Sequence, residues 1–156
     1  MNSDDDLISV SLSAEELRGV YALVEFRRTL MHLPPDEDSD EMKSLRGMTP
    51  EDLDAEARDL QECEYDHYAY ALEYGGCDSG STQFKRQYRL KLIKHVVGDM
   101  RFESVLAPIN AKWHPILQDI HRRLDEPRDC RECGQPTVFE DLWETACADC
   151  DHGSLA

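Results

Sequence analysis

Four cysteines near the C-terminus constrain this chain more than any other feature. Cys130 and Cys133 form one Cys-x-x-Cys pair, Cys147 and Cys150 form a second, and thirteen residues separate the two pairs. Each pair can hold one side of a tetrahedral metal ion, and thiolate is a ligand that suits Zn²⁺. Four thiolates leave no coordination position for a catalytic water. The spacing therefore predicts one structural Zn²⁺.

The residues between the pairs predict a small β-hairpin. Residues 136–139 and 142–145 are expected to form two short strands, and Gly134 follows the first pair, where a tight turn favours a residue that tolerates positive φ. This pattern resembles the zinc-ribbon class, in which a β-hairpin presents both metal-binding turns. The resemblance covers residues 128–153 and implies a metal site without implying an activity.

Two alternatives to a metal site are a disulfide and a redox pair. A reducing cytosol argues against structural disulfides, and a redox Cys-x-x-Cys usually lies where a strand meets a helix, a context that this segment lacks. So small a segment has little core. Metal binding is therefore expected to supply most of its folding free energy, on the order of 10 kcal/mol or more.

Four further residues are candidate metal ligands: Cys63, His67 and Cys77 as one set, and His152 beside the last pair. If the helix before Cys77 ends at Tyr74, Cys63 lies about 16 Å back along it, and three residues reach back only about 10 Å. A shared metal or disulfide is not expected, and buried free cysteine is the better interpretation. His152 either replaces or hydrogen-bonds a ligand thiolate, or is an exposed loop residue.

Apolar periodicity predicts four helices. The first begins at a Ser13 N-cap with Glu16 completing a capping box and runs to about Leu33. The second begins at a Thr49 N-cap and ends near Tyr74, before two glycines. The third, about residues 81–106, is basic and carries an apolar row that includes Met100. The fourth starts near Pro108 or Pro115 and closes at Pro127, with Ile116 facing inward.

The expected fold is mainly α: an antiparallel bundle of about four helices with a small C-terminal β-hairpin zinc ribbon. The expected domains are a helical domain over residues 1–127 and the zinc ribbon over residues 128–156. Residues 36–47 are polar and acidic, and they are expected to form a flexible connector within the helical domain.

The chain is strongly acidic, with 33 acids, 17 bases and a net charge of −16. It also contains more Arg than Lys, and this composition resembles that of haloarchaeal proteins, whether from a host or a virus. The alternative is an ordinary acidic bacterial or viral protein. The acidic N-terminus is unlike a signal peptide, and no apolar run approaches the roughly 18–20 residues of a membrane span. We expect a cytoplasmic protein, or a virion component if it is viral, without membrane contact.

The charge is unevenly distributed along the sequence. Residues 1–80 carry 21 acids and 6 bases, residues 81–128 carry 5 acids and 10 bases, and residues 129–156 carry 7 acids and 1 base. The basic island supplies candidate contacts to nucleic acid or a partner: Lys85, Arg86, Arg89, Lys94, Arg122 and Arg123. The alternative is that these cations pair with the acids of the first and second helices.

Three classes of function are compared. No phosphate-binding glycine loop, nucleophile motif or paired-carboxylate site is found, so an enzyme with a small-molecule substrate is not expected. The preferred interpretation is a non-enzymatic zinc-stabilised adaptor or structural subunit, with a protein partner or a homo-oligomer, for example a connector of a haloarchaeal tailed virus. The alternative is a nucleic-acid-associated regulatory protein of transcription or translation that uses the basic third helix.

Overall fold

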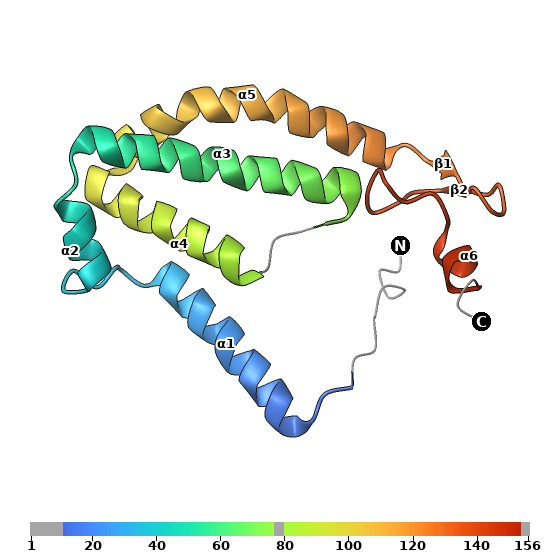
Figure 1. The fold of residues 1–156 in the computed structure, drawn as a ribbon, viewed down its shortest axis with the longest axis horizontal. Coiled ribbons are helices and arrows are strands. Elements are labelled where there is room, and N and C mark those ends of the chain that lie inside the picture. The colour runs from blue at the N-terminus through green and yellow to red at the C-terminus, as the bar shows by residue number, and fades with distance from the viewer. Residues whose placement is uncertain (1–10, 77–79, 154–156) are drawn as a thin grey trace. The chain divides into compact units, whose positions relative to one another are not determined.

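The computed structural model describes residues 11–76 and 80–153, which fall into two compact units, Met1–Pro35 and Asp36–Ala156. The described part of the first unit contains one helix, α1 (Ala14–His32). The second contains the remaining elements (Figure 1): α2 (Asp40–Arg46), α3 (Pro50–Tyr74), α4 (Gly80–Val97), α5 (Asp99–Asp125), β1 (Arg128–Asp129), β2 (Pro136–Thr137) and α6 (Ala148–Gly153).

The start of α1 confirms the predicted capping box. The Ser13 backbone N–H donates to Glu16 Oε2 over 2.8 Å, and the Glu16 N–H donates to Ser13 Oγ over 3.2 Å. Two of the N–H groups that a helix start leaves without partners are thereby satisfied. The helix ends at His32, before Pro34 and Pro35, and none of its residues is buried.

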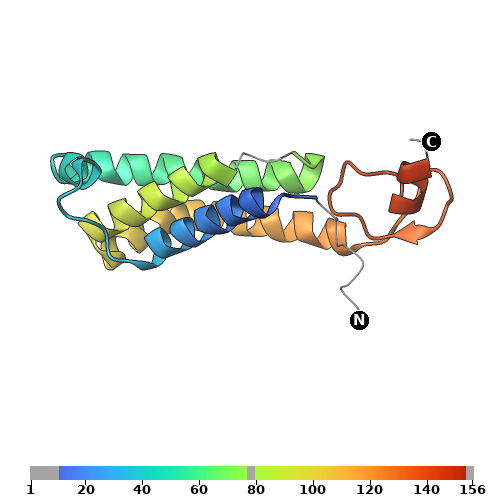
Figure 2. The same cartoon turned by 90° about the horizontal axis from the view of Figure 1, so that it is seen from below.

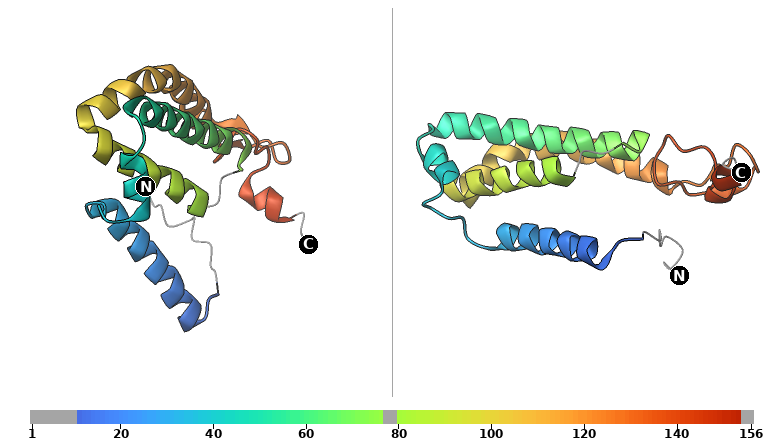
Figure 3. Two further views of the ribbon diagram at one scale, coloured as in Figure 1. Left: turned by 60° about the vertical axis from the view of Figure 1, so that its left-hand side comes forward. Right: turned by 60° about the horizontal axis from the view of Figure 1, so that its bottom comes forward.

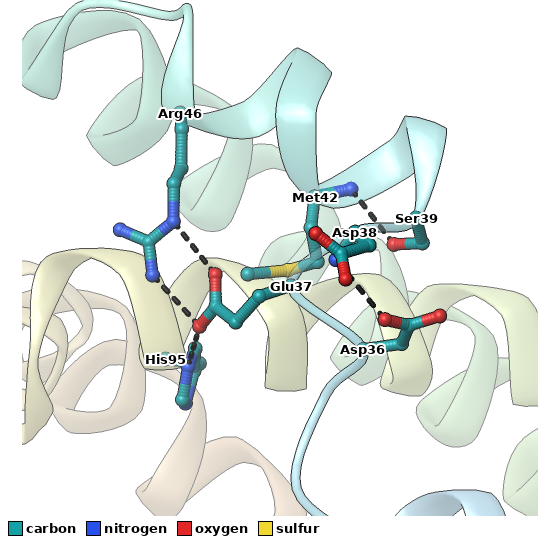
Figure 4. A network of polar contacts seen from close by, with 7 residues as sticks. All are labelled: Asp36, Glu37, Asp38, Ser39, Met42, Arg46 and His95. Atoms are coloured by element: carbon teal, nitrogen blue, oxygen red, sulfur yellow. Dashed lines mark hydrogen bonds and ion pairs between the residues drawn. The ribbon is translucent and has the colours of Figure 1, made fainter.

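The segment expected to be a flexible connector contains a packed helix instead. Ser39 caps α2, and Met42 and Leu45 are fully buried in the core of the second unit. Polar contacts hold the segment as well, because the Glu37 carboxylate accepts from Arg46 over 2.8 Å and lies 2.6 Å from His95 of α4 (Figure 4). Two apolar residues among many acids were too weak a pattern to predict this.

Three long helices build the second unit (Figures 1 and 2). Consecutive helices run antiparallel, as expected, so α3 and α5 point the same way with α4 between them in the chain. The ends of α3 confirm the prediction: Thr49 caps it, Pro50 follows, and Gly75 closes it at φ 72°. One core cluster joins α2, α3, α4 and α5 around Leu92 and Ile93, and a second joins α3 and α5 around Trp113 and Ile120.

The predicted boundary between the third and fourth helices is wrong. The break falls at Gly98, at φ 89°, and α5 runs through both Pro108 and Pro115. An internal proline removes one helical hydrogen bond, but α5 buries Leu106, Trp113, Ile120 and Leu124, and this burial holds the helix together across both prolines. Met100 now lies after the break and is exposed, as is Ile116, although both were expected to face the core.

The predicted fold class is confirmed, since the described chain is mainly helical with one two-stranded antiparallel hairpin near its C-terminus. Figure 3 shows this hairpin and α6 beyond the C-terminal ends of α3 and α5. The hairpin segment belongs to the same compact unit as these helices, and the domain boundary at residue 128 stays a prediction. Among the residues described, no helix has the length and apolar character needed to cross a membrane.

Candidate metal centre

The four cysteines of the two pairs meet at one point. The sulfur atoms of Cys130, Cys133, Cys147 and Cys150 all lie within 4.8 Å of one another, and those of Cys133 and Cys147 are 3.7 Å apart. Four sulfurs around a tetrahedral ion at about 2.3 Å would be about 3.8 Å apart, whereas a disulfide bond is about 2.05 Å long. The cluster is thus positioned to bind a metal ion, and its thiols are free.

The first pair lies in the turn of the hairpin. β1 pairs antiparallel with β2, with Arg128 opposite Thr137 and Asp129 opposite Pro136. Within the turn, the Cys130 N–H donates to the Gln135 carbonyl over 2.9 Å, and the Gly134 N–H donates to the Cys130 carbonyl over 2.8 Å. Gly134 has φ 71°, which confirms the prediction of a positive-φ residue after the first pair.

The second pair lies in a different setting from the one expected. The hairpin does not lie between the two pairs: residues 138–145 form no strand, and Cys147 directly precedes α6, with Cys150 in its first turn. The Cys147 N–H donates to Cys130 Sγ over 3.2 Å. The alternation of residues 136–145 resembled two strands, but the loop around Asp141 packs against the helices instead.

Backbone donors favour the ionised form of the Cys130 thiol, and the close packing of sulfur atoms disfavours the ionised form of the Cys150 thiol. Hydrogen bonds from the backbone of Cys133 and of Cys147 lower the pKa of Cys130 to about 6. Hydrogen bonding to Cys147 and Cys133, burial, and the neighbouring Cys130 charge raise the pKa of Cys150 to about 12. Four thiolates therefore need a bound cation to coexist here, which is the chemistry of a metal site.

Arg128 organises the loop between the two cysteine pairs. Its guanidinium donates to the carbonyls of Asp141 over 2.7 Å, Leu142 over 3.1 Å and Glu144 over 3.2 Å. The guanidinium also lies over the Phe139 ring, 4.6 Å from its centroid. Sequence reasoning counted Arg128 only as part of the basic island, because nothing local shows which carbonyls an arginine will reach.

The same loop packs on the helices. The Leu142 side chain packs against the second core cluster, and the Leu142 N–H donates to the Leu72 carbonyl over 3.0 Å. The buried Asp141 carboxylate accepts from the N–H groups of Trp143 and Glu144 and lies against Gly75 at the end of α3. The cysteine cluster is thereby attached to the C-terminal end of α3.

Among the described residues, neither Cys63 nor His67 belongs to the cluster. Cys63 is a free thiol that is half-buried in α3, less buried than expected. Cys77 and the side chain of His152 lie outside the described residues, so neither of their expected roles is tested.

The basic helix faces the acids of α3. Arg86 Nε lies 2.5 Å from Glu64 Oε1, and these side chains are only 11% and 15% exposed. Arg89 pairs with Glu56 over 2.6 Å and with Glu41 of α2 over 3.3 Å. Further along, Arg101 of α5 pairs with Asp54 over 2.8 Å, and Lys112 pairs with Glu62. Much of the positive charge of the basic island is therefore neutralised within the second unit.

Three of the six candidate cations line one hollow, and Lys94, Arg122 and Arg123 do not. The hollow has a volume of about 550 Å³ and is lined by the cations Lys85, Arg86 and Arg89, by the carboxylate of Glu41, and by the apolar side chains of Leu60, Phe84 and Tyr88. Lys94 lies over the Phe102 ring at 5.8 Å. Arg122 and Arg123 are exposed near the end of α5, and both pair with Asp119 of the same helix.

Comparison with known proteins gave no match: no family model, no curated protein and no solved structure is similar to this chain. The fold and the site therefore define only a class of protein. It is a small helical protein whose four-cysteine cluster is positioned to bind a metal ion and packs against the helices.

Proposed function

We propose that this protein is a non-enzymatic, zinc-stabilised interaction protein that serves as an adaptor or structural subunit of a larger assembly. One observation carries the choice over nucleic-acid binding: Arg86 and Arg89 are paired with Glu64 and Glu56 of the same unit. An arginine held by a half-buried carboxylate must break that pair before it can contact a phosphate.

Zinc is the metal that the ligand set supports best. Four thiolates favour Zn²⁺ over the hard cations, which prefer oxygen ligands. A site closed by four sulfurs has no open position for substrate or water, which supports a structural rather than a catalytic ion. The metal would hold β1, β2 and α6 together, and those elements carry the loop that packs on α3.

The assembly that the protein serves is proposed from composition alone. A net charge of −16 and a preference for Arg over Lys fit a haloarchaeal cell or its viruses, and a connector of a tailed virus is one such subunit. At molar salt the Debye length is about 3 Å, so contacts there depend more on apolar surface than on charge.

Nucleic-acid binding remains the second candidate because Lys85, Arg86 and Arg89 line one hollow. The test is fluorescence anisotropy of labelled duplex DNA, single-stranded DNA and RNA, titrated with the zinc-loaded full chain at low and at molar KCl. We expect no binding at either salt concentration. Binding that weakens steeply with salt would replace the adaptor proposal with the nucleic-acid one.

A charge variant makes that test sharper. Glu56→Gln together with Glu64→Gln would release Arg89 and Arg86 from their carboxylates without changing side-chain size. If the pairs are what prevents phosphate contact, this double variant should bind nucleic acid at low salt while the wild type does not.

A further inference from the structure

Three aromatic side chains form an exposed row where α3 meets the loop between the cysteine pairs. The rings of Tyr70 and Tyr74 lie 4.9 Å apart, and those of Tyr74 and Trp143 lie 6.0 Å apart. These side chains are 56%, 49% and 70% exposed. All three belong to the second unit, so the geometry of the row does not depend on where α1 lies. We call this row the aromatic patch.

The rings of the aromatic patch are held in place from both ends of the row. The Tyr70 ring lies against Gly76, where an added Cβ would be 3.0 Å from Tyr70 Cε1. At the other end, the Trp143 backbone is fixed by the bond from its N–H to Asp141 Oδ1, 2.8 Å long. Rings that are ordered before binding lose little conformational entropy when a partner covers them. Tyr and Trp are also the residues that most often dominate the energy of a protein interface.

Elsewhere in the second unit, aromatic rings are paired with cations of the same chain. Lys112 lies 5.4 Å from the centroid of the Trp113 ring, and Arg128 lies over the Phe139 ring. Among the described residues of the second unit, no cation lies over a ring of the aromatic patch. A cation is attracted to the face of an aromatic ring by the quadrupole of that ring. The aromatic patch therefore offers an external cation the kind of contact that other rings make internally.

The segments that carry the aromatic patch contain acids but no lysine or arginine, over residues 59–84 and again over residues 132–156. Glu73 lies one turn from Tyr70 on α3, and Glu144 directly follows Trp143 in the loop. Glu144 also accepts from the Glu140 N–H over 3.2 Å, which brings two acids together. None of these three glutamates forms an ion pair with a described residue. Their charge is therefore available to a partner.

Two further features make this surface electronegative. The aromatic patch includes the last residue of α3, and the C-terminal end of a helix carries partial negative charge. In the loop, burial and then the charges of Asp141 and Glu140 raise the pKa of Glu144, because negative groups are crowded there. An arriving cation would relieve this repulsion, whereas an anion would add to it.

We propose that the aromatic patch binds an arginine-bearing segment of a partner protein. This rests on the proposed function as an adaptor and gives its partner a chemistry. The guanidinium group is planar and weakly hydrated, so it stacks on aromatic rings while its N–H groups donate to carboxylates such as those of Glu73 and Glu140. Stacking acts at short range and persists at salt concentrations that screen long-range attraction.

Fluorescence anisotropy of a labelled peptide tests the proposal. The peptide alternates arginine with glycine and serine, and a matched peptide carries citrulline, which has nearly the shape of arginine without its charge. Each is titrated with the zinc-loaded full chain in molar KCl, where general attraction to the acidic chain is screened. The wild type should bind the arginine peptide with a dissociation constant on the order of 0.1 to 1 mM. It should bind the citrulline peptide at least about fivefold more weakly.

Single substitutions locate the binding surface. Trp143→Ala and Tyr70→Ala should each weaken binding of the arginine peptide at least about fivefold. Tyr68→Ala is the matched control, since Tyr68 is also an exposed tyrosine of α3, at 46%, but it lies against His121 of α5. It should bind as the wild type does. Helicity by circular dichroism and zinc content are compared in all variants, and if Trp143→Ala loses zinc, Tyr70→Ala decides.

A charge comparison tests the contribution of the acids. Glu73→Gln together with Glu140→Gln should weaken binding about twofold or more at about 0.1 M KCl. Glu51→Gln together with Asp38→Asn removes the same number of exposed or half-buried charges outside the aromatic patch, and it should have a smaller effect.

Several results would overturn the proposal. The first is a wild type that does not bind the arginine peptide, as it would not if another part of the chain or a second copy covered the aromatic patch. The others are equal binding of the arginine and citrulline peptides, and equal effects of Tyr70→Ala and Tyr68→Ala. Failure here is separate from failure of the proposed function, which the titration of nucleic acids decides.

Discussion

The backbone N–H of Leu142 donates to the carbonyl oxygen of Leu72 over 3.0 Å, and this bond joins the metal-binding segment to the last turn of α3. Carbonyls in the last turn of a helix have no partner within the helix. The loop between the cysteine pairs supplies one, and the Leu142 side chain extends the core that α3 shares with α5. Metal binding and helix packing are therefore physically connected.

Loss of one ligand should release the metal and unfold the segment around it. For Cys147→Ser we expect zinc to fall from about one per chain to near zero, because three thiolates bind far more weakly than four. Amide signals of residues 128–153 should collapse in an NMR spectrum, while those of the α4 core persist. Cys63→Ser makes the same chemical change outside the cluster and should keep its zinc. Full zinc in Cys147→Ser would contradict the site.

Gly75→Ala should weaken the attachment of the loop to α3. Gly75 has φ 72°, where an alanine costs about 1–2 kcal/mol, and an added Cβ would lie 2.5 Å from Asp141 Oδ2. We expect a loss of at least that size in the free energy of unfolding, measured by urea denaturation. Gly47→Ala is the control, since its φ is −81° and the nearest atom would lie 3.4 Å away. An equal effect of both substitutions would argue against the Asp141 contact.

The contact of Glu37 with Arg46 and His95 should make stability depend on acid pH. Hydrogen bonds from Arg46 and then His95 lower the pKa of Glu37 from 4.5 to about 2. A lowered pKa in the folded state adds stability above the unfolded-state value, and this stability is lost as the pH falls from about 4.5 to about 2. Glu37→Gln should thus be less stable than the wild type at pH 6, with the difference shrinking towards pH 2.

Urea midpoints measured at several pH values between these limits would show that trend. Asp38→Asn removes the same charge one residue away, without the contact to Arg46, and controls for net charge alone. A difference between Glu37→Gln and the wild type that did not change with pH would mean that the contact is absent in solution.

Leu45→Ala should destabilise the second unit by about 2–5 kcal/mol, the range for removing a buried leucine. Leu45 is fully buried although its neighbours in the chain are mostly polar. Lys43→Ala in the same helix should change the free energy of unfolding by less than about 0.5 kcal/mol. Equal urea unfolding midpoints for Leu45→Ala and Lys43→Ala would mean that residues 36–47 form a flexible connector and do not contribute to the core.

Some of this fold could be predicted from the sequence because the signals are local. The N-caps at Ser13 and Thr49 and the positive-φ glycines Gly75 and Gly134 act through neighbours within a few residues, and all four were identified in advance. The metal-ligand set was equally accessible, since two Cys-x-x-Cys pairs carry their own geometry. Helix ends that depend on packing could not be predicted from the sequence. Pro108 and Pro115 locally favour the end of a helix, but contacts with distant residues keep α5 helical across both.

The sequence by itself determined where helices α1 and α3 begin, which four thiols gather, and that charge is divided between acidic and basic segments. Only the tertiary structure decided that Arg86 and Arg89 lie against Glu64 and Glu56, that Arg128 holds the loop of the metal segment, and that α2 contributes to the core. The physical reason is the separation along the chain of the residues that interact. Caps, turns and ligand spacing act over a few residues, whereas ion pairs and core contacts join residues that lie far apart in the chain and meet only when helices pack.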